Sequence, residues 1–378
     1  ANSVLRVTLT APEGDKLYYT LDGNDPAQWN DEPHPSAHVC SPGTTIALTE
    51  SALLSVRAFS TSTGRWSLST RAEYLFGGRY AMPGDVQLSE IHYHPATNEQ
   101  ANRLPELTDR AYEFVEILNV ADCDISLNGC RFPQDMPANE LVLGPVLLKP
   151  GGRAVVARHR EAFRERYGTS VTPVAYWLYG GLADSGETVF LLNRDGLALD
   201  RVAYKTGGSW PKTADGKGAS LNRASFGPLA LPAPWKEAIP TPGRPCYWEW
   251  LDQRGISSPD GDADGDGVAN LVEYFSGADP WNPDDKGLSD MTGFQAGREG
   301  IRISYRQAFG RDDVWASLQA SEDLTEWFDI DAPFLHAEAI GDGYLWTLAL
   351  PPEEFDAYKS RFFRLRVWPA TVPRSGDR

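Results

Sequence analysis

The sequence has few cysteines, few basic residues and no long hydrophobic run. Its 378 residues include four cysteines, too few for a disulfide scaffold. The longest nearly apolar stretch, residues 141–148, is far shorter than the roughly 20 residues of a membrane-spanning helix, so we expect no membrane span. Against 52 Asp and Glu there are 35 Lys and Arg, a net charge of −17, which disfavours binding to nucleic acid or to anionic membranes. Cations are the expected ligands.

Glycine and proline, in contrast, are plentiful. The 35 glycines and 28 prolines are spread along the chain and indicate many tight turns between short elements, which favours an all-β fold. Hydrophobic residues make up 41%, enough for packed cores. The length predicts two to three domains at roughly 150 residues each. Because the chain opens at Ala1 without an initiator Met, we expect that it starts inside a larger protein whose secretion signal was removed or lies outside this sequence.

The first segment, residues 1–78, has the pattern of a small β-sandwich. Short alternating strands are predicted at 4–10, 17–21, 44–48 and 53–60. The words YYTLDGNDP at 18–26 and GRWS at 64–67, with residues 51–59, resemble the immunoglobulin-like domain at the C-terminus of chitobiases and β-hexosaminidases. In physical terms, Asp22-Gly23 and Asp25-Pro26 are turn formers.

The second segment, residues 82–247, continues the β pattern. Strands are predicted at 86–93, 112–119, 153–157, 188–192 and 199–204. One helix is predicted at 158–167, with Phe163 and Tyr167 four residues apart on one face and Gly168 at its end. The segment resembles the bacterial lamin tail domain, an immunoglobulin-like sandwich. The resemblance rests on the words LSEIHYHP at 88–95, EFVEILN at 113–119, ISLNG at 125–129, LKPGG at 148–152, GLADSGE at 181–187 and WP at 210–211.

The cysteines of this segment suggest a crosslink. Cys123 and Cys130 are close enough in sequence to close a short loop in an oxidising compartment, and two reduced core cysteines are the alternative. Cys130 stands where lamin tail domains usually have a large apolar residue, so a bond would replace lost packing. The chain-entropy model gives such a loop about 2–3 kcal/mol. Whether Cys40 and Cys246 pair is left open.

The strongest chemical signal lies in the third segment, residues 248–287. From Glu249 to Asp290 eleven acids stand against two bases. The run DADGDGVANLVE at 262–273 fits the EF-hand calcium loop, because hard Ca²⁺ takes six to eight oxygen ligands and the loop supplies them at fixed spacings, with a glycine at the sixth place. The predicted ligands are Asp262, Asp264, Asp266, the Val268 carbonyl, Asn270 directly or through water, and Glu273.

This calcium loop is expected to stand alone. Gly255 and Pro259 interrupt an entering helix, whereas a leaving helix is predicted at 270–275, ended by Gly277. The following residues 278–284 resemble the continuation of thrombospondin type 3-like calcium repeats. We expect the ion to order a connector while the cores of the neighbouring β domains stay independent of the loop. A solvated acidic linker is the alternative.

The fourth segment, residues 290–369, returns to β patterning. Ile301, Ile303 and Tyr305 alternate with polar residues, as do Phe363, Leu365 and Val367. The words ASEDLTEW at 320–327 and RFFRLRV at 361–367 resemble a C-terminal β module of large secreted bacterial proteins.

Other candidate sites carry weaker signals. Glu90, His92 and His94 alternate and could hold a transition metal from one strand face, although rim residues of a sandwich explain them better. Glu113 and Glu116 are three apart, so they are no catalytic carboxylate pair and are expected to be structural.

Most motifs for nucleophilic catalysis are absent from the sequence. It contains no Gly-x-Ser-x-Gly elbow, His-Glu-x-x-His or phosphate-binding glycine loop. The single Ser-x-x-Lys, at residues 209–212, overlaps the WP word of the lamin tail resemblance, and we expect no enzyme activity. Trp29 and Trp66 are the first candidates for an aromatic platform that stacks on sugar rings.

Together these observations predict an all-β fold: tandem immunoglobulin-like β-sandwiches, a short helical EF-hand-like calcium connector and a small C-terminal β domain. The expected function is that of a noncatalytic region, secreted to the extracellular space or cell surface, which spaces or anchors a larger protein and holds structural Ca²⁺. Expected partners are other domains of that parent protein, cell-surface or matrix components in adhesion, and a glycan. A carbohydrate-binding accessory module is the alternative, and a metal-dependent hydrolase using Glu90, His92 and His94 is third.

Overall fold

The computed structural model is mostly β and describes residues 4–12, 15–96, 107–133, 140–177, 180–226, 235–285, 294–297, 300–330, 335–350 and 362–370. Its chain forms two compact units. Unit 1 contains Ala1–Tyr93, Ala101–Thr206 and Pro228–Pro232, and unit 2 contains His94–Gln100, Gly207–Gly227 and Ala233–Arg378. The four domain boundaries predicted from the sequence stay predictions.

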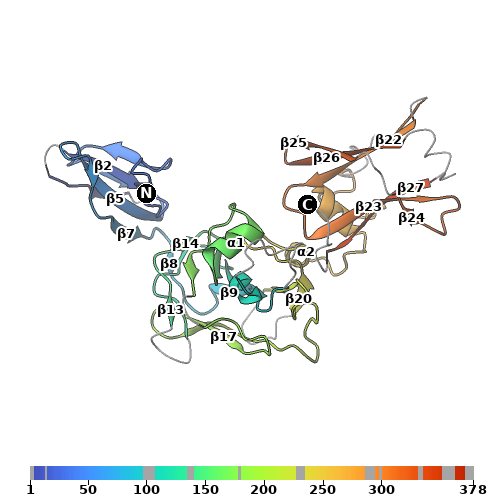
Figure 1. Ribbon diagram of the computed structural model, residues 1–378, viewed down its shortest axis with the longest axis horizontal. Coiled ribbons are helices and arrows are strands. Elements are labelled where there is room, and N and C mark those ends of the chain that lie inside the picture. The colour runs from blue at the N-terminus through green and yellow to red at the C-terminus, as the bar shows by residue number, and fades with distance from the viewer. Residues whose placement is uncertain are drawn as a thin grey trace. The chain divides into compact units, whose positions relative to one another are not determined.

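The first strands of unit 1 form a small β domain (Figure 1). The sheet order is β3-β2-β5-β6, β7 pairs with β5, and β1 pairs with β4. These strands enclose a small apolar core that includes Leu17, Leu48 and Leu54. The strands are β1 (Leu5–Thr8), β2 (Asp15–Thr20), β3 (His38–Cys40), β4 (Thr45–Leu48), β5 (Ala52–Ser60), β6 (Arg65–Trp66) and β7 (Thr70–Tyr74).

The remainder of unit 1 is built on two adjacent central strands. Both β9 and β10 are buried along their whole length, which means that both faces of the sheet are covered there. In sheet order, the strands run β16-β15-β10-β9, β14-β11-β8 and β13-β12-β17-β18. The bounds are β8 (Arg79–Tyr80), β9 (Val86–His92), η1 (Asp109–Tyr112), β10 (Phe114–Asn119), β11 (Ile125–Ser126), β12 (Arg131–Phe132), β13 (Leu141–Val142), β14 (Leu147–Leu148), β15 (Arg153–Ala157), β16 (Ala175–Tyr176), β17 (Thr188–Leu192) and β18 (Ala198–Ala203).

The helix of unit 1 confirms the sequence prediction. Helix α1 (Arg160–Tyr167) begins after His159, whose ring accepts a hydrogen bond from the Ala162 N–H, and ends at Gly168 with φ of +80°. Its Phe163 and Tyr167 rings pack edge-on or tilted against each other and against Phe114 of β10. The 3.6-residue spacing therefore did place both aromatic rings on the core face.

In the described residues of unit 2, two short helices are combined with three groups of strands. The groups are β19 paired with β20, the sheet β21-β22-β26-β25, and the sheet β24-β23-β27. Helix α2 was not predicted, because its aromatic-rich sequence has modest helix propensity and is stabilised by packing. The bounds are β19 (Ser220–Arg223), β20 (Trp235–Ala238), α2 (Tyr247–Gln253), α3 (Asn270–Ser276), β21 (Phe294–Gly297), β22 (Gly300–Ala308), β23 (Val314–Ser321), β24 (Phe328–Asp329), β25 (Leu335–Ile340), β26 (Gly343–Leu350) and β27 (Phe362–Pro369).

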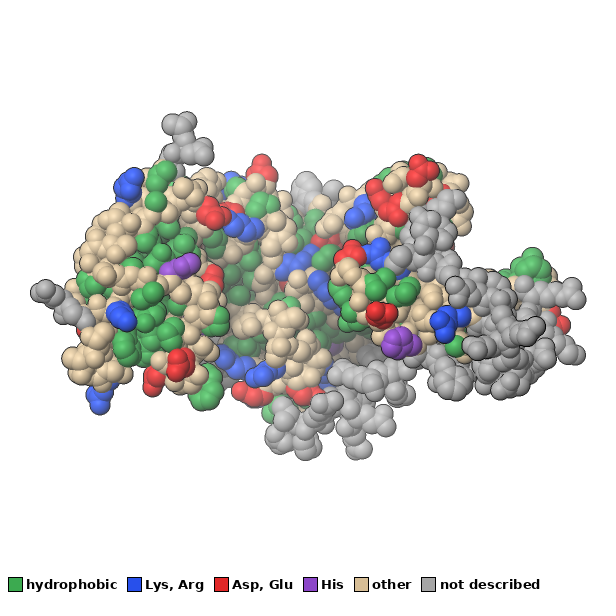
Figure 2. All heavy atoms as spheres, turned by 90° about the horizontal axis from the view of Figure 1, so that it is seen from above, with side chains coloured by type: hydrophobic (Ala, Val, Ile, Leu, Met, Phe, Trp, Pro, Cys, Tyr) green, Lys and Arg blue, Asp and Glu red, His purple; other side chains and the backbone are tan. Residues whose placement is uncertain are grey.

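Two expectations from the sequence concern membrane-spanning helices and surface charge. Within the described part of the chain, every helix is too short or too polar to cross a membrane. On the face drawn in Figure 2, acidic and basic side chains are interspersed, so the negative net charge is not gathered in one patch there.

The disulfide predicted between Cys123 and Cys130 is not formed in the structure, where all four cysteines are free thiols. The Cys130 side chain is packed in the core at 1% exposure, and burial raises its pKa to about 12. Cys123 instead lies in the turn after β10, where its Sγ accepts a hydrogen bond from Arg79 Nη1 at 3.1 Å. The Cys130 side chain is thus packed in the core, while the Cys123 sulfur is hydrogen-bonded to Arg79.

We therefore expect four free thiols in protein purified without reductant. Because the thiolate is the reactive form and needs solvent access, iodoacetamide should label Cys123 in the native protein, and Cys130 only after unfolding. Mass spectrometry of native and denatured alkylated samples measures this. A crosslinked peptide containing Cys123 and Cys130 in a nonreduced digest would contradict it.

Candidate metal centre

The acidic loop is a closed turn whose two ends are hydrogen-bonded to each other. At its base, the Asn270 N–H donates to the Gly261 carbonyl at 2.8 Å and the Leu271 N–H donates to the Pro259 carbonyl at 2.9 Å. Gly267 has φ of +93°, a backbone conformation that the turn needs and that L residues rarely adopt. The turn therefore requires glycine at the sixth place of the loop, while the ion around which it would turn stays a prediction.

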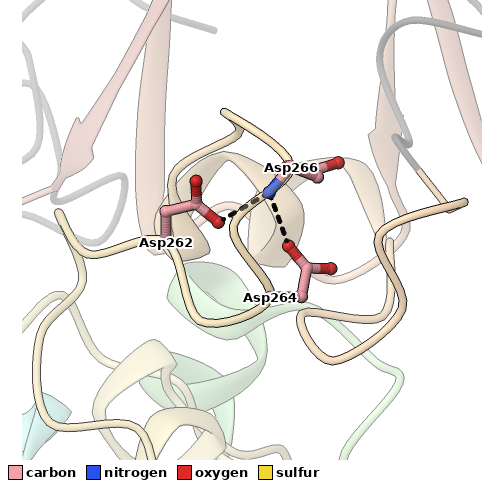
Figure 3. A group of neighbouring side chains, drawn as sticks. All are labelled: Asp262, Asp264 and Asp266. Carbon is pink, nitrogen blue, oxygen red and sulfur yellow. Dashed lines mark hydrogen bonds between the residues drawn. The ribbon is translucent and has the colours of Figure 1, made fainter.

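Three aspartates converge inside the turn (Figure 3). Asp262, Asp264 and Asp266 each place a carboxylate oxygen within 4.8 Å of the others, and they are the one group of three or more His, Cys, Asp or Glu side chains with metal-ligand spacing in the described chain. Asp262 Oδ1 accepts from the Asp266 N–H at 3.2 Å and Asp264 Oδ1 accepts from the same N–H at 3.1 Å. The Gly267 N–H, which donates to Asp262 Oδ2 at 2.8 Å, lowers the pKa of Asp262.

Glu273 is the most unusual member of the site. Its side chain lies on α3, is 0% exposed, and neither carboxylate oxygen has a hydrogen-bond partner. The second oxygens of Asp264 and Asp266 are also buried without a partner. Burial, followed by repulsion from Asp264 and Asp266, raises the pKa of Glu273 to about 7. A buried carboxylate oxygen without a hydrogen-bond donor or a cation is energetically costly. Four such oxygens are present here: both of Glu273 and one each of Asp264 and Asp266.

Asn270, predicted to bind the ion directly or through water, makes two hydrogen bonds within the loop, and its contact with the ion stays a prediction. Its side-chain Nδ2 donates to the Ser258 carbonyl at 2.9 Å, and its Oδ1 accepts from the Ala263 N–H at 3.1 Å. The side chain is 2% exposed. Asn270 therefore ties the two ends of the loop together, a contact that its position in the calcium-loop pattern did not indicate.

The helix that leaves the loop is part of the core of unit 2. Leu271, Tyr274 and Phe275 of α3 are buried together with residues of α2, β22 and β23. Gly277 ends the helix with φ of +82°, and a Cβ atom there would lie 2.9 Å from Ala308 Cβ of β22. The expectation that the cores of the β domains do not depend on the loop stays a prediction, but the same short helix carries Glu273 and these core side chains, so the loop and the core are directly connected.

A buried aspartate joins the helices to the C-terminal strands. Asp313 is 0% exposed, and its carboxylate accepts from the Tyr247 N–H at 2.7 Å and from Tyr274 Oη at 2.8 Å. Burial raises its pKa, while Arg244, whose Nη1 lies 3.7 Å from Asp313 Oδ1, opposes that shift. Sequence reasoning missed Asp313, since nothing in the local pattern distinguishes it from the exposed Asp312 beside it.

The other candidate metal ligands have separate partners. His92 Nδ1 lies 2.8 Å from Tyr167 Oη, and His94 Nδ1 lies 2.7 Å from Asp215 Oδ1. Strand β9 ends at His92, so His94 does not continue the predicted alternation of Glu90 and His92. These contacts give the two histidines structural partners.

The two glutamates of the second segment are buried and hydrogen-bonded, as expected for structural groups. Glu116 Oε1 accepts from Ser89 Oγ at 2.6 Å and is paired with Arg153. Glu113 Oε2 accepts from the Leu182 N–H at 2.8 Å, and burial raises the pKa of Glu113 to about 8.

The two tryptophans proposed as a sugar platform differ in exposure. Trp29 is 96% exposed, whereas Trp66 packs against Tyr18 and Phe59 with ring centroids 4.9 and 5.0 Å apart. The Trp66 Nε1–H donates to the Asp31 carbonyl at 2.9 Å. Trp66 therefore supports the loop that carries Trp29 and is not itself an open platform.

Comparison with known proteins does not identify the chain. No family model and no curated protein matches it. One similar solved structure is a DUF4876 family protein from Bacteroides thetaiotaomicron, at 10% identity and a TM-score of 0.27, covering 58% of this chain and 86% of that one. We take no fold or function from a likeness at that score. The specific domain resemblances seen in the sequence remain predictions.

Proposed function

We propose that residues 258–277 bind one calcium ion, which stabilises unit 2 of a noncatalytic, extracellular or cell-surface region. The observation that carries this proposal is Glu273, fully buried beside three aspartates with neither carboxylate oxygen partnered. A cation among these carboxylates would compensate the repulsion and satisfy the unpaired oxygens.

The donor set selects the kind of ion. Asp262, Asp264 and Asp266 form the group with metal-ligand spacing, and Glu273 lies outside that group but close enough for their charges to raise its pKa. All four side chains offer only oxygen, which suits a hard cation. Larger Ca²⁺ accepts irregular coordination by six to eight oxygens, whereas Mg²⁺ demands near-octahedral geometry and dehydrates reluctantly. The Val268 carbonyl would complete the protein's ligands with water. Asn270 would act beside them, by keeping the loop closed.

The proposed role of the ion is to hold α3 in place. Glu273 would face the ion, while the next two residues, Tyr274 and Phe275, pack in the core of unit 2. Calcium would thus contribute to folding and not only to the stiffness of a linker. A spacer or anchor built of immunoglobulin-like and lamin tail-like domains fits the resemblances in the sequence. The alternative, a carbohydrate-binding accessory module, is favoured by the full exposure of Trp29.

Calorimetric titration of the whole chain with CaCl₂ tests the proposal. We expect one ion per chain, with a Kd on the order of 10⁻⁴ M or below, and weaker binding of MgCl₂. Glu273→Gln should weaken calcium binding at least tenfold because it removes a charged ligand. It should not destabilise the calcium-free protein, because a neutral amide is easier to bury than a carboxylate.

The matched control is Asp260→Asn. Asp260 is exposed and lies two residues before the first predicted ligand, so this variant changes the local charge by the same amount but should alter the Kd less than threefold. Absence of binding heat in the wild type, or equal affinity in Glu273→Gln and Asp260→Asn, would reject the calcium site.

A further inference from the structure

A single tryptophan projects from the loop that joins β2 to β3. Trp29 is 96% exposed, while the only other tryptophan among the strongly exposed residues of the described chain, Trp281, is 55% exposed and donates its Nε1–H to the Arg254 carbonyl. A fully exposed indole on a folded loop leaves a large flat apolar ring in water. Such a ring fits a ligand with a flat apolar face of its own.

The loop that carries Trp29 is braced by hydrogen bonds on both sides of the ring. The Gln28 N–H donates to the Glu32 carbonyl at 2.7 Å, and the His34 N–H donates to the Pro26 carbonyl at 2.8 Å. From the adjacent strand β6, Trp66 donates to the Asp31 carbonyl. The backbone that carries Trp29 is therefore held before any ligand arrives, which reduces the entropy that binding would cost.

Polar residues follow the exposed ring in the chain. Asn30, Asp31 and Glu32 follow Trp29 directly and are all exposed, and no ion pair to either carboxylate occurs within the described chain. Carboxylates accept hydrogen bonds from hydroxyl groups, and the Asn30 amide can also donate. The tip thus combines one stacking surface with several hydrogen-bonding groups.

The chemistry of the tip distinguishes between ligand classes. Nucleic acid and anionic lipid would be repelled by Asp31 and Glu32. Ammonium groups are best recognised when several aromatic rings desolvate them, whereas Trp29 is open to water and Trp66 is packed into the domain. An uncharged pyranose with equatorial hydroxyls offers a flat C–H face to the indole and hydroxyl donors to the carboxylates.

We propose that the loop at residues 26–34 binds an uncharged polymer of pyranose rings with equatorial hydroxyls, with one sugar ring stacked on Trp29 and its hydroxyls donating to Asp31 and Glu32. This site goes beyond the proposed calcium function and does not depend on it, because the loop belongs to unit 1 and the calcium loop to unit 2.

The test is retention of the whole chain on insoluble cellulose, chitin and xylan in the presence of calcium. We expect wild-type protein to bind at least one of them, Trp29→Ala to bind at least tenfold more weakly, and Trp29→Tyr to keep part of the affinity. Leu68→Ala is the matched control, since Leu68 is 90% exposed on the same small β domain but cannot stack on a sugar ring.

Any of the following outcomes would reject the sugar site. Lack of retention on all three polymers, or equal loss in Trp29→Ala and Leu68→Ala, would mean that the ring does not bind a pyranose specifically. Loss of wild-type binding in 1 M NaCl would mean that charged groups on the polymer hold the protein, since stacking and hydrogen bonds to an uncharged sugar resist salt. Calcium titration of Trp29→Ala should match the wild type, which separates this proposal from the calcium proposal.

Discussion

Removal of calcium should expose the core of unit 2 to hydrogen exchange while unit 1 stays protected. Leu271, Tyr274 and Phe275 pack in the same cluster as Tyr305 of β22 and Val314 of β23, so release of α3 would uncover both strands. Binding to the folded state alone stabilises by about 2.7 kcal/mol when calcium exceeds its Kd a hundredfold. Amide exchange limited by opening of this unit should therefore become up to about a hundredfold faster in chelator.

Hydrogen-exchange mass spectrometry with excess CaCl₂ or EGTA measures this effect. Peptides from α3, β22 and β23 should gain deuterium faster in EGTA, and peptides from β9 and β10 should not change. Glu273→Gln protein is the internal control, because its weaker calcium binding should make the difference in exchange between the two conditions smaller than in the wild type. If faster exchange is confined to residues 258–269, the ion would stiffen only the loop, and the coupling through α3 would be disproved.

Replacement of Asp313 by alanine should cost unit 2 on the order of 3 kcal/mol. The change would leave the Tyr247 N–H and Tyr274 Oη buried without an acceptor, at roughly 1–3 kcal/mol for each group, and it would leave Arg244 without its buried counter-ion. Loss of that much stability lies in the severe range for a single substitution. Asp313→Asn, which keeps one acceptor oxygen, should cost less than Asp313→Ala.

Urea denaturation followed by tryptophan fluorescence, with calcium in excess, measures this cost. Asp312→Ala is the matched control, because its side chain is 71% exposed, although it also pairs with Arg244, and exposed pairs contribute about 0–1 kcal/mol. Equal midpoints for the two variants would show that Asp313 does not hold the helices and strands together.

Much of the local structure follows from the sequence because its causes lie within a few residues. The alternation of apolar side chains predicted β15 and β17 at their observed bounds, and the spacing of Phe163, Tyr167 and Gly168 predicted the core face and the end of α1. Helix α2 was missed, since its stability comes from contacts with distant parts of the chain and not from its own residues.

The candidate metal centre shows the same division. The sequence by itself determined the cluster of Asp262, Asp264 and Asp266 and the turn at Gly267, because aspartates at alternate positions around a glycine turn are brought together by the local backbone. Only the tertiary structure decided that Glu273 is buried without a partner, since its burial depends on how α3 packs against α2 and the C-terminal strands.

Tertiary contacts also decided the roles of single residues that the sequence could not distinguish. Asp313 accepts hydrogen bonds from residues 66 and 39 positions away, whereas Asp312, its neighbour with the same side chain, is exposed. Trp29 projects into solvent while Trp66 is packed, and Cys130 is buried as a thiol. The physical reason is that burial and distant hydrogen bonds depend on which segments contact one another in the folded chain. The periodicity of a short stretch contains no information about those contacts.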